Sequence, residues 1–524
     1  MIFNTHNLTW TSQNQTGKVV NLRMELLTTT YKDKISGVLS CLDRVILTGT
    51  LPQVCHSSGM TSYLFSKGVR IFDYPKFAEP FKEKLRSNAE QIAKGNGIEI
   101  EFVSKSHIRK EDLVKKVLDK RGIHPGLVHI LSAMEACGSY RPWHDKQSGK
   151  TFLKGTQSKC LHYYFYFIDD YLGYGYIRVP TWCPFKLQVY INGHNILANE
   201  MKKHGMKYSM IDNAFDYIED FSKAQEICDN IDIQKVHKRL DKLAKTYCPV
   251  YSSFNQVYHW SIMQAEYATD IVFRKQEYLQ SIYSELTTTA IHTVKPDNIA
   301  TFLGHKVDSR YQGEMGNNYN IRIEGSRIKH TMGKSSIKMY DKFSKILRIE
   351  TTTNDVSFFK HYREVEHRNG TKSMKFAPLK KNIYSLTLLA LLFKASNKRY
   401  LEFISAFDNK EAGHKRLDKI TKPRKENNRN YKGFNLFCND DLSLLLTVLK
   451  GEYNISGFRN KDIRRWLPVF NTGKISRLIK RLKVFGLIKK AGKTYKYYLT
   501  RLGKELVITA EKLKETVLIP ALNY

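Results

Sequence analysis

Apolar residues recur every three or four positions between residues 472 and 485, the spacing of a helix with one buried side. These apolar positions are Ile475, Leu478, Ile479, Leu482 and Phe485. The opposite side of the predicted helix is basic and consists of Lys474, Arg477, Lys480, Arg481 and Lys483. Asn471 or Thr472 is a suitable N-cap, and Gly486 is a suitable end. The pattern therefore predicts an amphipathic helix whose solvent side is strongly positive.

Two further helices and a hairpin are predicted around this helix. One helix covers Lys461–Leu467 with Asn460 as its N-cap, and an apolar helix covers about 440–449. Two short strands follow within residues 487–499. These elements add further basic residues, namely Arg464, Arg465, Lys489, Lys490 and Lys493. The order resembles the winged helix-turn-helix of MarR-like regulators, and the resemblance implies a winged helix in residues 435–524 whose second helix enters the major groove of DNA.

Upstream, strand-like and helix-like patterns alternate, which is typical of an α/β layer. Strands are predicted at 42–47, 98–103, 126–131, 162–168, 173–179 and 185–191, and helices at 77–94, 111–120 and 195–204. Residues 213–290 are predicted to be mainly helical, 318–360 to form strands, and 381–406 to form one or two apolar helices.

These elements predict an α+β (mixed α/β) multidomain chain with a C-terminal winged-helix domain. The expected segments are a loose N-terminus (1–21), an α/β domain (22–148), a β-hairpin sheet plus helical region (149–300), a β-rich segment with the polar hairpin 336–352 and following helices (301–408), a basic linker (409–434) and the winged helix-turn-helix (435–524).

The hairpin at residues 336–352 is the best candidate for chemistry. Its alternation places Ile337, Met339, Leu347 and Ile349 on one face, and a loop at 343–345 sets Lys338 opposite Glu350 and Tyr340 opposite Arg348. The candidate catalytic residues are Glu350, Asp341, Tyr340 and Lys342. Glu350 and Asp341 are the candidate ligands for Mg²⁺ or Mn²⁺, while lysine and arginine can hold phosphates. The competing interpretation is a set of ordinary cross-strand pairs on an exposed sheet.

The sequence Tyr340-Asp341-Lys342, followed by Arg348-Ile349-Glu350, is similar to the paired strands of rolling-circle replication initiators and filamentous-phage nickases. The resemblance covers about 30 residues. It implies that Glu350 helps to bind a metal ion and that a tyrosine elsewhere attacks a DNA phosphate. The chain departs from this pattern because it contains no His-hydrophobic-His motif, and none of its 31 tyrosines is assigned as the nucleophile.

Asp169 and Asp170, with Asp43 as a partner, are the alternative metal ligands, because acidic residues at strand ends hold metal ions in RNase H-like nucleases. Turn chemistry also explains this Asp-Asp pair. The tyrosine-rich strand 162–168 is interpreted as a core strand or a stacking surface for bases. His194 stays a minor candidate. The group His361, Glu364, Glu366 and His367 is interpreted as a solvated charged helix and matches no zinc site.

The net charge of +35 favours a polyanionic partner, and it is densest in residues 421–500, where 19 Lys and Arg residues stand against 5 Asp and Glu. Eight cysteines without a Cys-x-x-Cys pair favour reduced thiols in a cytoplasmic protein. The longest uncharged apolar run, at 386–393, is too short to cross a bilayer, and no signal peptide is recognised at the N-terminus. No membrane partner is therefore expected, and no oligomeric state follows from the sequence.

Three functions remain open after these observations. The first is a metal-dependent DNA-processing enzyme, a nickase or nuclease of a mobile element or replication origin, targeted by the winged helix. The second is a non-catalytic, sequence-specific DNA-binding regulator. The third is an RNA-binding or RNA-processing protein that uses the aromatic sheet for stacking. DNA is the favoured nucleic acid.

Overall fold

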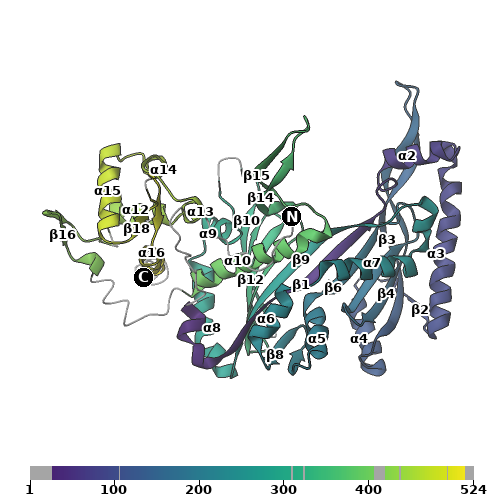
Figure 1. The fold of residues 1–524 in the computed structure, drawn as a ribbon, viewed down its shortest axis with the longest axis horizontal. Helices are drawn as coiled ribbons and strands as arrows, with labels where there is room; N and C mark the ends of the chain where they lie inside the picture. Colours follow the sequence, from purple (N-terminus) through teal and green to yellow (C-terminus); the bar gives the residue numbers. More distant parts are fainter. Residues whose placement is uncertain are drawn as a thin grey trace.

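The computed structural model describes residues 26–105, 107–307, 311–322, 325–405, 419–435, 438–492 and 494–513. The protein is a mixed α/β protein built on one eleven-stranded sheet with helices on both faces (Figure 1). The strand order is β10-β11-β12-β13-β9-β1-β6-β5-β4-β3-β2. The pair β2–β3 is parallel and the other neighbouring pairs are antiparallel.

The strands of this sheet come from all three segments expected between residues 22 and 408. They are β1 (Ile35–Thr50), β2 (Ile100–Phe102), β3 (Gly126–His144), β4 (Thr151–Asp169), β5 (Gly173–Pro180), β6 (Leu187–Asn192), β9 (His259–Phe273), β10 (Met315–Arg322), β11 (Gly325–Met332), β12 (Ser335–Lys342) and β13 (Ile346–Thr353). Four two-stranded hairpins lie outside it: β7 (Tyr208–Ile211) with β8 (Ala214–Ile218), β14 (Lys360–Glu366) with β15 (Lys372–Pro378), β16 (Arg424–Glu426) with β17 (Arg429–Tyr431), and β18 (Ile488–Lys490) with β19 (Tyr497–Leu499).

The helices fall into two groups along the chain. Those of the sheet-bearing part are α1 (Leu26–Thr30), α2 (Ser57–Ser66), α3 (Tyr74–Asn96), α4 (Lys110–Arg121), α5 (Gly193–Lys203), α6 (Phe221–Asp229), α7 (Ile233–Tyr247), α8 (Gln276–His292), α9 (Pro296–Phe302) and α10 (Leu386–Ile404). Those of the C-terminal part are α12 (Asn439–Leu449), α13 (Gly451–Ser456), α14 (Asn460–Trp466), α15 (Thr472–Val484) and α16 (Arg501–Leu513). None of the helices in the described ranges is both long and apolar enough to span a bilayer.

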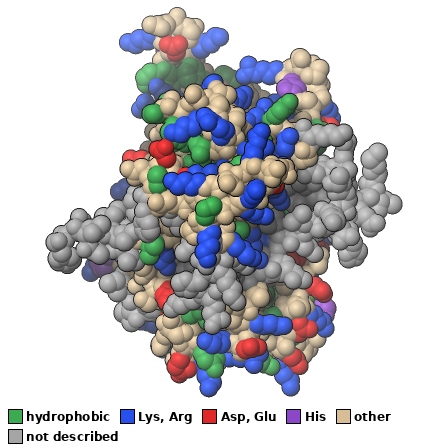
Figure 2. Space-filling model, turned by 90° about the vertical axis from the view of Figure 1, so that its left-hand side faces the viewer, with side chains coloured by type: hydrophobic (Ala, Val, Ile, Leu, Met, Phe, Trp, Pro, Cys, Tyr) green, Lys and Arg blue, Asp and Glu red, His purple; other side chains and the backbone are tan. Residues whose placement is uncertain are grey.

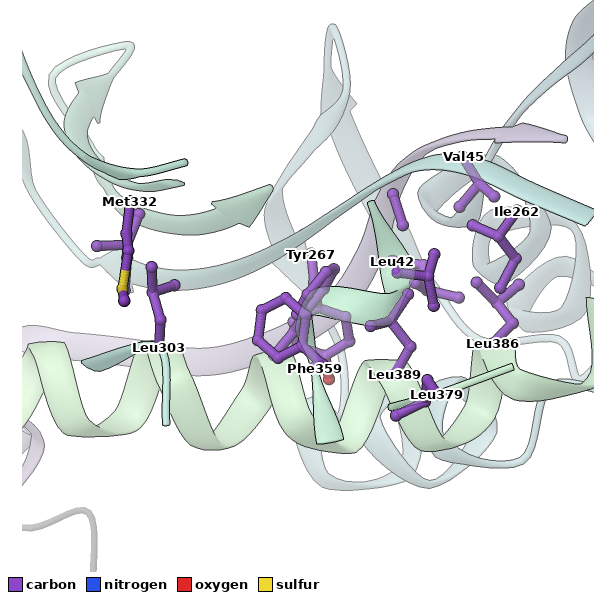
Figure 3. Close-up of a cluster of buried hydrophobic side chains, with 14 of the residues drawn as sticks. Leu42, Val45, Ile262, Tyr267, Leu303, Met332, Phe359, Leu379, Leu386 and Leu389 are labelled. Carbon is purple, nitrogen blue, oxygen red and sulfur yellow. The ribbon is translucent and has the colours of Figure 1, made fainter. Parts of the chain in front are cut away.

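The main apolar core lies between the sheet and the layer that contains α3, α7 and α10. Figure 3 shows how Leu386 and Leu389 of α10 point toward Leu42, Val45 and Ile262 on the central strands. These side chains are almost completely buried, and truncating such a leucine to alanine costs about 2–5 kcal/mol. The core therefore fixes the positions of β1, β9 and β13, whose other face carries the candidate site.

The opposite face of the sheet is covered in two places. The first cover consists of α5, α6 and the β7–β8 hairpin, which pack on Leu39 and Cys41 of β1. The second cover is α4, whose Val114 packs among Leu131, Tyr164 and Tyr166. Between these two covers the sheet face is polar, because alternate residues of β9, β13 and β12 are charged.

The C-terminal part packs on the end of the sheet-bearing part. Helix α13 lies against α9, where Lys450 pairs with Asp297 at 2.9 Å. Lys295 also pairs with Glu511 on α16. These ion pairs connect the basic C-terminal part to the helix that precedes β10.

Most elements predicted from periodicity are confirmed, including the strands at 42–47 and 126–131 and the hairpin at 162–179. Residues 213–290 are mainly helical, as predicted, but they also contain β8 and the long central strand β9, which were not predicted. Two predictions are wrong. The charged group at 361–367 lies on strand β14 rather than on a helix. Helix α14 is capped by Arg459 and not by Asn460, since the Asp462 carboxylate accepts from the Arg459 backbone N–H at 2.8 Å.

Candidate metal centre

Three carboxylates converge on the polar face near the middle of the sheet. Asp43 lies on β1, Glu266 on β9 and Glu350 on β13, and one oxygen atom of each lies within 4.8 Å of the other two. Strand β9 lies between β1 and β13, so three adjacent strands supply one carboxylate each. We refer to Asp43, Glu266 and Glu350 as the acidic triad.

Asp43 lies on this face by regular alternation after Leu39 and Cys41, and a β-bulge follows directly in β1. The pairing of β1 with β9 shifts between Leu42–Tyr267 and Val45–Ala265, so Asp43 and Arg44 together oppose Glu266. In a regular strand, neighbouring side chains point to opposite faces, but the extra residue of a bulge re-aims one of them. The bulge therefore returns Val45 to the core and leaves both Asp43 and Arg44 opposite Glu266, with Arg44 exposed at the rim.

The Asp43 carboxylate is held by donors from several elements. Its Oδ1 accepts from the side-chain amides of Asn192 at 2.8 Å and Asn213 at 2.9 Å. Its Oδ2 accepts from Arg348 at 3.1 Å, and His194 Nδ1 lies 3.5 Å from Oδ1. Burial raises the pKa of Asp43, but His194 and Arg348 outweigh burial, so the pKa lies well below its ordinary value. Asp43 is therefore ionised and fixed in orientation.

Arg348 is completely buried and connects two of these strands. Its Nε and Nη2 donate to the two carboxylate oxygens of Asp270, both at 2.6 Å, and Nη2 also donates to the backbone carbonyl of Asn213 at 2.8 Å. A planar guanidinium matches a carboxylate in this two-pronged way. Because Arg348 also bonds Asp43, one buried cation positions β1, β9 and β13 relative to one another.

Glu350 is fixed by residues of the neighbouring strand β12. The pairing of Lys338 with Glu350 and of Tyr340 with Arg348, predicted from the loop length, is confirmed. Lys338 Nζ donates to Glu350 Oε1, and the Tyr340 hydroxyl donates to Oε2 at 2.9 Å. Burial raises the pKa of Glu350, but the charge of Lys338 outweighs burial and the net shift is downward. The interpretation of these residues as pairs on an exposed sheet is wrong, because the Glu350 side chain is 3 % exposed.

Glu266 behaves differently from the other two members of the triad. Burial, and then the charge of Glu350, raises its pKa from 4.5 to about 7, although Lys338 lies 3.8 Å away and opposes the shift. A neutral carboxyl beside two carboxylates is the expected response to crowded negative charge. A bound cation would favour the ionised form instead.

The triad fits a hard divalent cation in its donor chemistry and in its size. Mg²⁺ and Mn²⁺ prefer carboxylate oxygens, and Mg²⁺ lies about 2.1 Å from its ligands, so ligands on opposite sides are about 4.2 Å apart. One oxygen atom of each carboxylate lies within 4.8 Å of the others, so the three could reach one ion and would leave its remaining positions to water or a phosphate oxygen. Such an ion would polarise a phosphoryl oxygen, with Lys338 beside it as a further positive charge.

The two remaining candidate residues of the hairpin, Lys342 and Asp341, lie on opposite faces of the sheet. Lys342 Nζ donates to Asp212 at 3.0 Å and to Asn213, and so helps to hold the loop that contacts Asp43. Asp341 lies on the opposite face of the sheet, where its backbone N–H donates to the Tyr283 hydroxyl at 3.0 Å. The structure therefore does not bring Asp341 together with Glu350.

Asp169 and Asp170 form a separate cluster at the β4–β5 turn. Asp169 Oδ1 accepts from the backbone N–H groups of Tyr171 and Leu172, and both aspartates pair with Arg239. This is the turn chemistry that the sequence also allowed. Asp43, which was paired with them as an alternative, groups with Glu350 instead.

Sequence reasoning missed Glu266 and Asp270, because strand β9 was assigned to a helical region. The alternation that marks this strand is visible at Trp260, Ile262, Ala265 and Tyr267, but its phase changes at a second bulge near Met263. His194, treated as a minor candidate, is buried beside Asp43 and lies 3.9 Å from Asp270. A search for strands that tolerates one bulge would have found the acidic residues of β9.

The basic residues of the C-terminal part lie on α14, α15 and the β18–β19 hairpin. Those that are exposed are Arg464, Arg465, Arg477, Lys480, Lys483, Lys489 and Lys490. Lys474 is half-buried and pairs with Asp440 at 3.1 Å. Lys493 lies outside the described residues.

Arg481 faces inward, in contrast to the exposed residues of α15. Its guanidinium donates to both carboxylate oxygens of Asp441, at 2.6 and 2.9 Å, and to the backbone carbonyls of Lys432 and Gly433. It also lies 4.0 Å from the centre of the Phe434 ring. We therefore assign Arg481 to the attachment of residues 432–434 rather than to a ligand-facing surface.

Comparisons with protein-family models, with curated proteins and with solved structures found no match to this chain.

Proposed function

We propose that this protein is a metal-dependent DNA-processing enzyme, a nickase or nuclease, whose reaction centre is the acidic triad. The observation that supports the proposal best is the convergence of Asp43, Glu266 and Glu350 from three adjacent strands, with Lys338 beside them. Carboxylates that gather at one point repel one another, and a divalent cation removes this cost. The net charge of +35 favours binding to a polyanion such as DNA.

Each residue of the site has a distinct role in this proposal. The triad holds Mg²⁺ or Mn²⁺, and Lys338 stabilises the negative charge that develops on the phosphate. Tyr340 positions Glu350, to which its hydroxyl donates, and we do not assign it as the nucleophile. Arg348 and His194 are positioning residues, because they contact Asp43 and Asp270 from buried positions.

The C-terminal part is proposed to be the winged helix that locates the DNA. Helices α14 and α15 are adjacent, Asn471 caps α15 through a bond to Lys474 N–H, and the β18–β19 hairpin follows. A bridge between Phe458 and Tyr497 adds a third short segment to this hairpin, as a wing requires. Figure 2 looks onto this end of the molecule and shows blue Lys and Arg side chains gathered over its middle and upper parts.

A cleavage assay tests the catalytic proposal. The purified chain is incubated with supercoiled plasmid, linear duplex, single-stranded DNA and RNA, each with Mg²⁺, Mn²⁺ or EDTA. We expect metal-dependent DNA products that Glu350→Gln and Glu266→Gln reduce by at least about 100-fold. Asp341→Asn, on the other face, and Glu364→Gln, on the exposed strand β14, are the controls and should cleave normally.

Equal cleavage by the Glu350→Gln variant and the parent chain would show that the triad is not the reaction centre. DNA binding without products under any metal condition would favour the second candidate, a non-catalytic DNA-binding regulator, which the exposed basic side of α15 supports by itself. Products from RNA alone would favour an RNA-processing enzyme.

A further inference from the structure

Strands β3 and β4 extend well beyond the sheet to which they belong. Strand β2 pairs with β3 only over residues 130–132, and β5 pairs with β4 only over 162–169. The pairing of β3 with β4 nevertheless continues to His144 and Thr151. Residues 136–158 thus form a two-stranded ribbon to which no third strand pairs within the described residues, and Figure 1 shows it projecting past α2.

One side of this ribbon is anchored to the protein. Leu153 is 1 % exposed, and its backbone N–H donates to Thr61 Oγ1 on α2 at 3.0 Å. The hydroxyl of the buried Tyr140 donates to the carbonyl of Val54 at 2.7 Å. The ribbon is therefore held in place before any ligand arrives, which lowers the entropic cost of binding.

The other side of the ribbon presents two aromatic rings and two cations to solvent. Trp143 pairs across the strands with Phe152, and Arg141 pairs with Lys154. Trp143 is 40 % exposed and Phe152 is 36 % exposed. The charged groups of Arg141 and Lys154 lie 5.3 and 4.7 Å from the Trp143 ring. We refer to these four residues as the ribbon patch.

Both cations of the ribbon patch lie beside the Trp143 ring, but no acidic side chain in the described part of the chain balances their charge. Like charges directly opposite each other on a hairpin are destabilising, and among the described residues neither Arg141 nor Lys154 forms an ion pair with an acidic group. Exposed aromatic rings beside unneutralised cations are the combination that binds single-stranded nucleic acid, because rings stack on bases and cations contact phosphates.

The ribbon patch lies on the same face of β4 as Tyr164 and Tyr166, which α4 covers, so a nucleic-acid strand that reaches the triad passes over α4 and not over these rings. Alternate residues of β4 connect Lys154 with Tyr164 and Tyr166, and Tyr166 contacts Tyr176 at 5.3 Å between ring centres. Tyr176 stacks on Tyr190 at 5.5 Å. Tyr190 in turn lies under Arg44, which shares the bulge with Asp43. The distance along β4 from residue 152 to 166 is about 46 Å.

We propose that the ribbon patch binds a single-stranded segment of nucleic acid whose other end lies at the acidic triad. The connection to the triad rests on the proposed function, whereas the binding itself does not. The patch offers stacking without base-edge hydrogen bonds, so the binding tolerates different sequences.

Fluorescence anisotropy tests this inference with a labelled oligothymidylate that spans more than about 46 Å, since β1 lies three strands beyond β4. The experiment uses the full chain in EDTA, so that cleavage does not enter the measurement. We expect Trp143→Ala/Phe152→Ala to weaken binding by about 10-fold or more, since stacking of one base contributes about 1–3 kcal/mol. Trp143→Phe, which keeps an aromatic ring, should restore most of the affinity. Arg141→Ala/Lys154→Ala should weaken binding and flatten its salt dependence.

The matched control is a second exposed aromatic pair on another hairpin. Tyr362 on β14 pairs directly with Phe376 on β15, and these residues are 61 % and 58 % exposed. Tyr362→Ala/Phe376→Ala should leave oligothymidylate binding unchanged. Unchanged binding by Trp143→Ala/Phe152→Ala would overturn the inference, and so would a loss confined to a duplex DNA probe. If Glu350→Gln abolishes cleavage but retains oligothymidylate binding, the cleavage function belongs to the triad and the binding function to the ribbon patch.

Discussion

At the residue scale, the site depends on buried charges that support one another. Arg348 pairs with both Asp43 and Asp270, and Lys338 pairs with Glu350. A buried ion pair contributes little by itself relative to apolar residues of similar shape, but removing one partner leaves the other charge uncompensated. The network therefore serves to orient the carboxylates, and its members are sensitive to single substitutions.

Replacing Arg348 by leucine should destabilise the protein by about 3–5 kcal/mol, because Asp43 and Asp270 would stay buried without their cation. Urea denaturation followed by circular dichroism measures this loss. Arg44→Leu, at the exposed rim of the same bulge, is the control and should change the free energy of unfolding by less than about 1 kcal/mol. Equal stability of the Arg348→Leu variant and the parent would contradict the assigned role.

Glu266 should make stability depend on pH. Its pKa is raised from 4.5 to about 7 in the folded protein, so the folded state holds this proton more tightly than the unfolded state. The contribution of this tightly held proton to the free energy of unfolding is therefore complete below pH 4.5, and it is lost as the pH rises through about 7. Glu266→Gln should remove this loss and be more stable than the parent at pH 8 by up to about 3 kcal/mol.

Unfolding in EDTA at pH 5 and pH 8 checks the pH prediction, with Glu364→Gln as the exposed control. A parent and a Gln variant with the same pH profile would show that Glu266 titrates normally. Adding Mg²⁺ should reduce the advantage of the Gln variant at pH 8, since the cation stabilises the ionised carboxylate.

At the element scale, two of the three register shifts between β1 and β9 decide which residues surround the site. One leaves both Asp43 and Arg44 opposite Glu266, and another changes the alternation of β9 near Met263. Helix α15 shows the same dependence on context, because its basic residues divide into exposed ones and the inward-facing Arg481. Helical periodicity alone places all of them on one solvent side.

Arg477→Ala and Arg481→Ala should therefore have different effects. Arg477 is exposed, and its loss should weaken binding to duplex DNA by about 1–3 kcal/mol if it contacts a base, with stability unchanged. Arg481→Ala should instead destabilise the C-terminal part by about 3 kcal/mol, because it leaves Asp441 unpaired. Gel shifts together with thermal unfolding distinguish the two, and identical behaviour of both variants would contradict the assignment.

At the scale of the whole molecule, exposed basic residues lie on the C-terminal part and on the projecting ribbon, whereas the acidic triad lies in the middle of the sheet. The C-terminal part is attached to the sheet-bearing part through α9 and α16. In the proposed function, DNA bound at α15 would therefore lie at a fixed position relative to the sheet-bearing part.

Affinity for duplex DNA should fall steeply with salt. If about six phosphates are neutralised, we expect a loss of about 1,000-fold between about 50 and 200 mM salt. Anisotropy titrations over this range measure the slope, and Lys489→Ala/Lys490→Ala should flatten it by about two phosphate contacts. Binding that does not respond to salt would exclude phosphate contacts as its main source.

The sequence by itself determined the features that depend on neighbouring residues. Periodicity located α3, α10 and α15, and alternation with a short loop set Lys338 opposite Glu350. The tertiary structure alone decided which acidic residues meet. Asp341 and Asp43 are equally acidic in the sequence, but Asp341 lies on the far face, whereas the pairing of β1, β9 and β13 places Asp43 beside Glu266 and Glu350. Glu266 joins them because β9 pairs with strands about 80 residues after it and more than 200 before it, and such register is set by packing of the whole sheet.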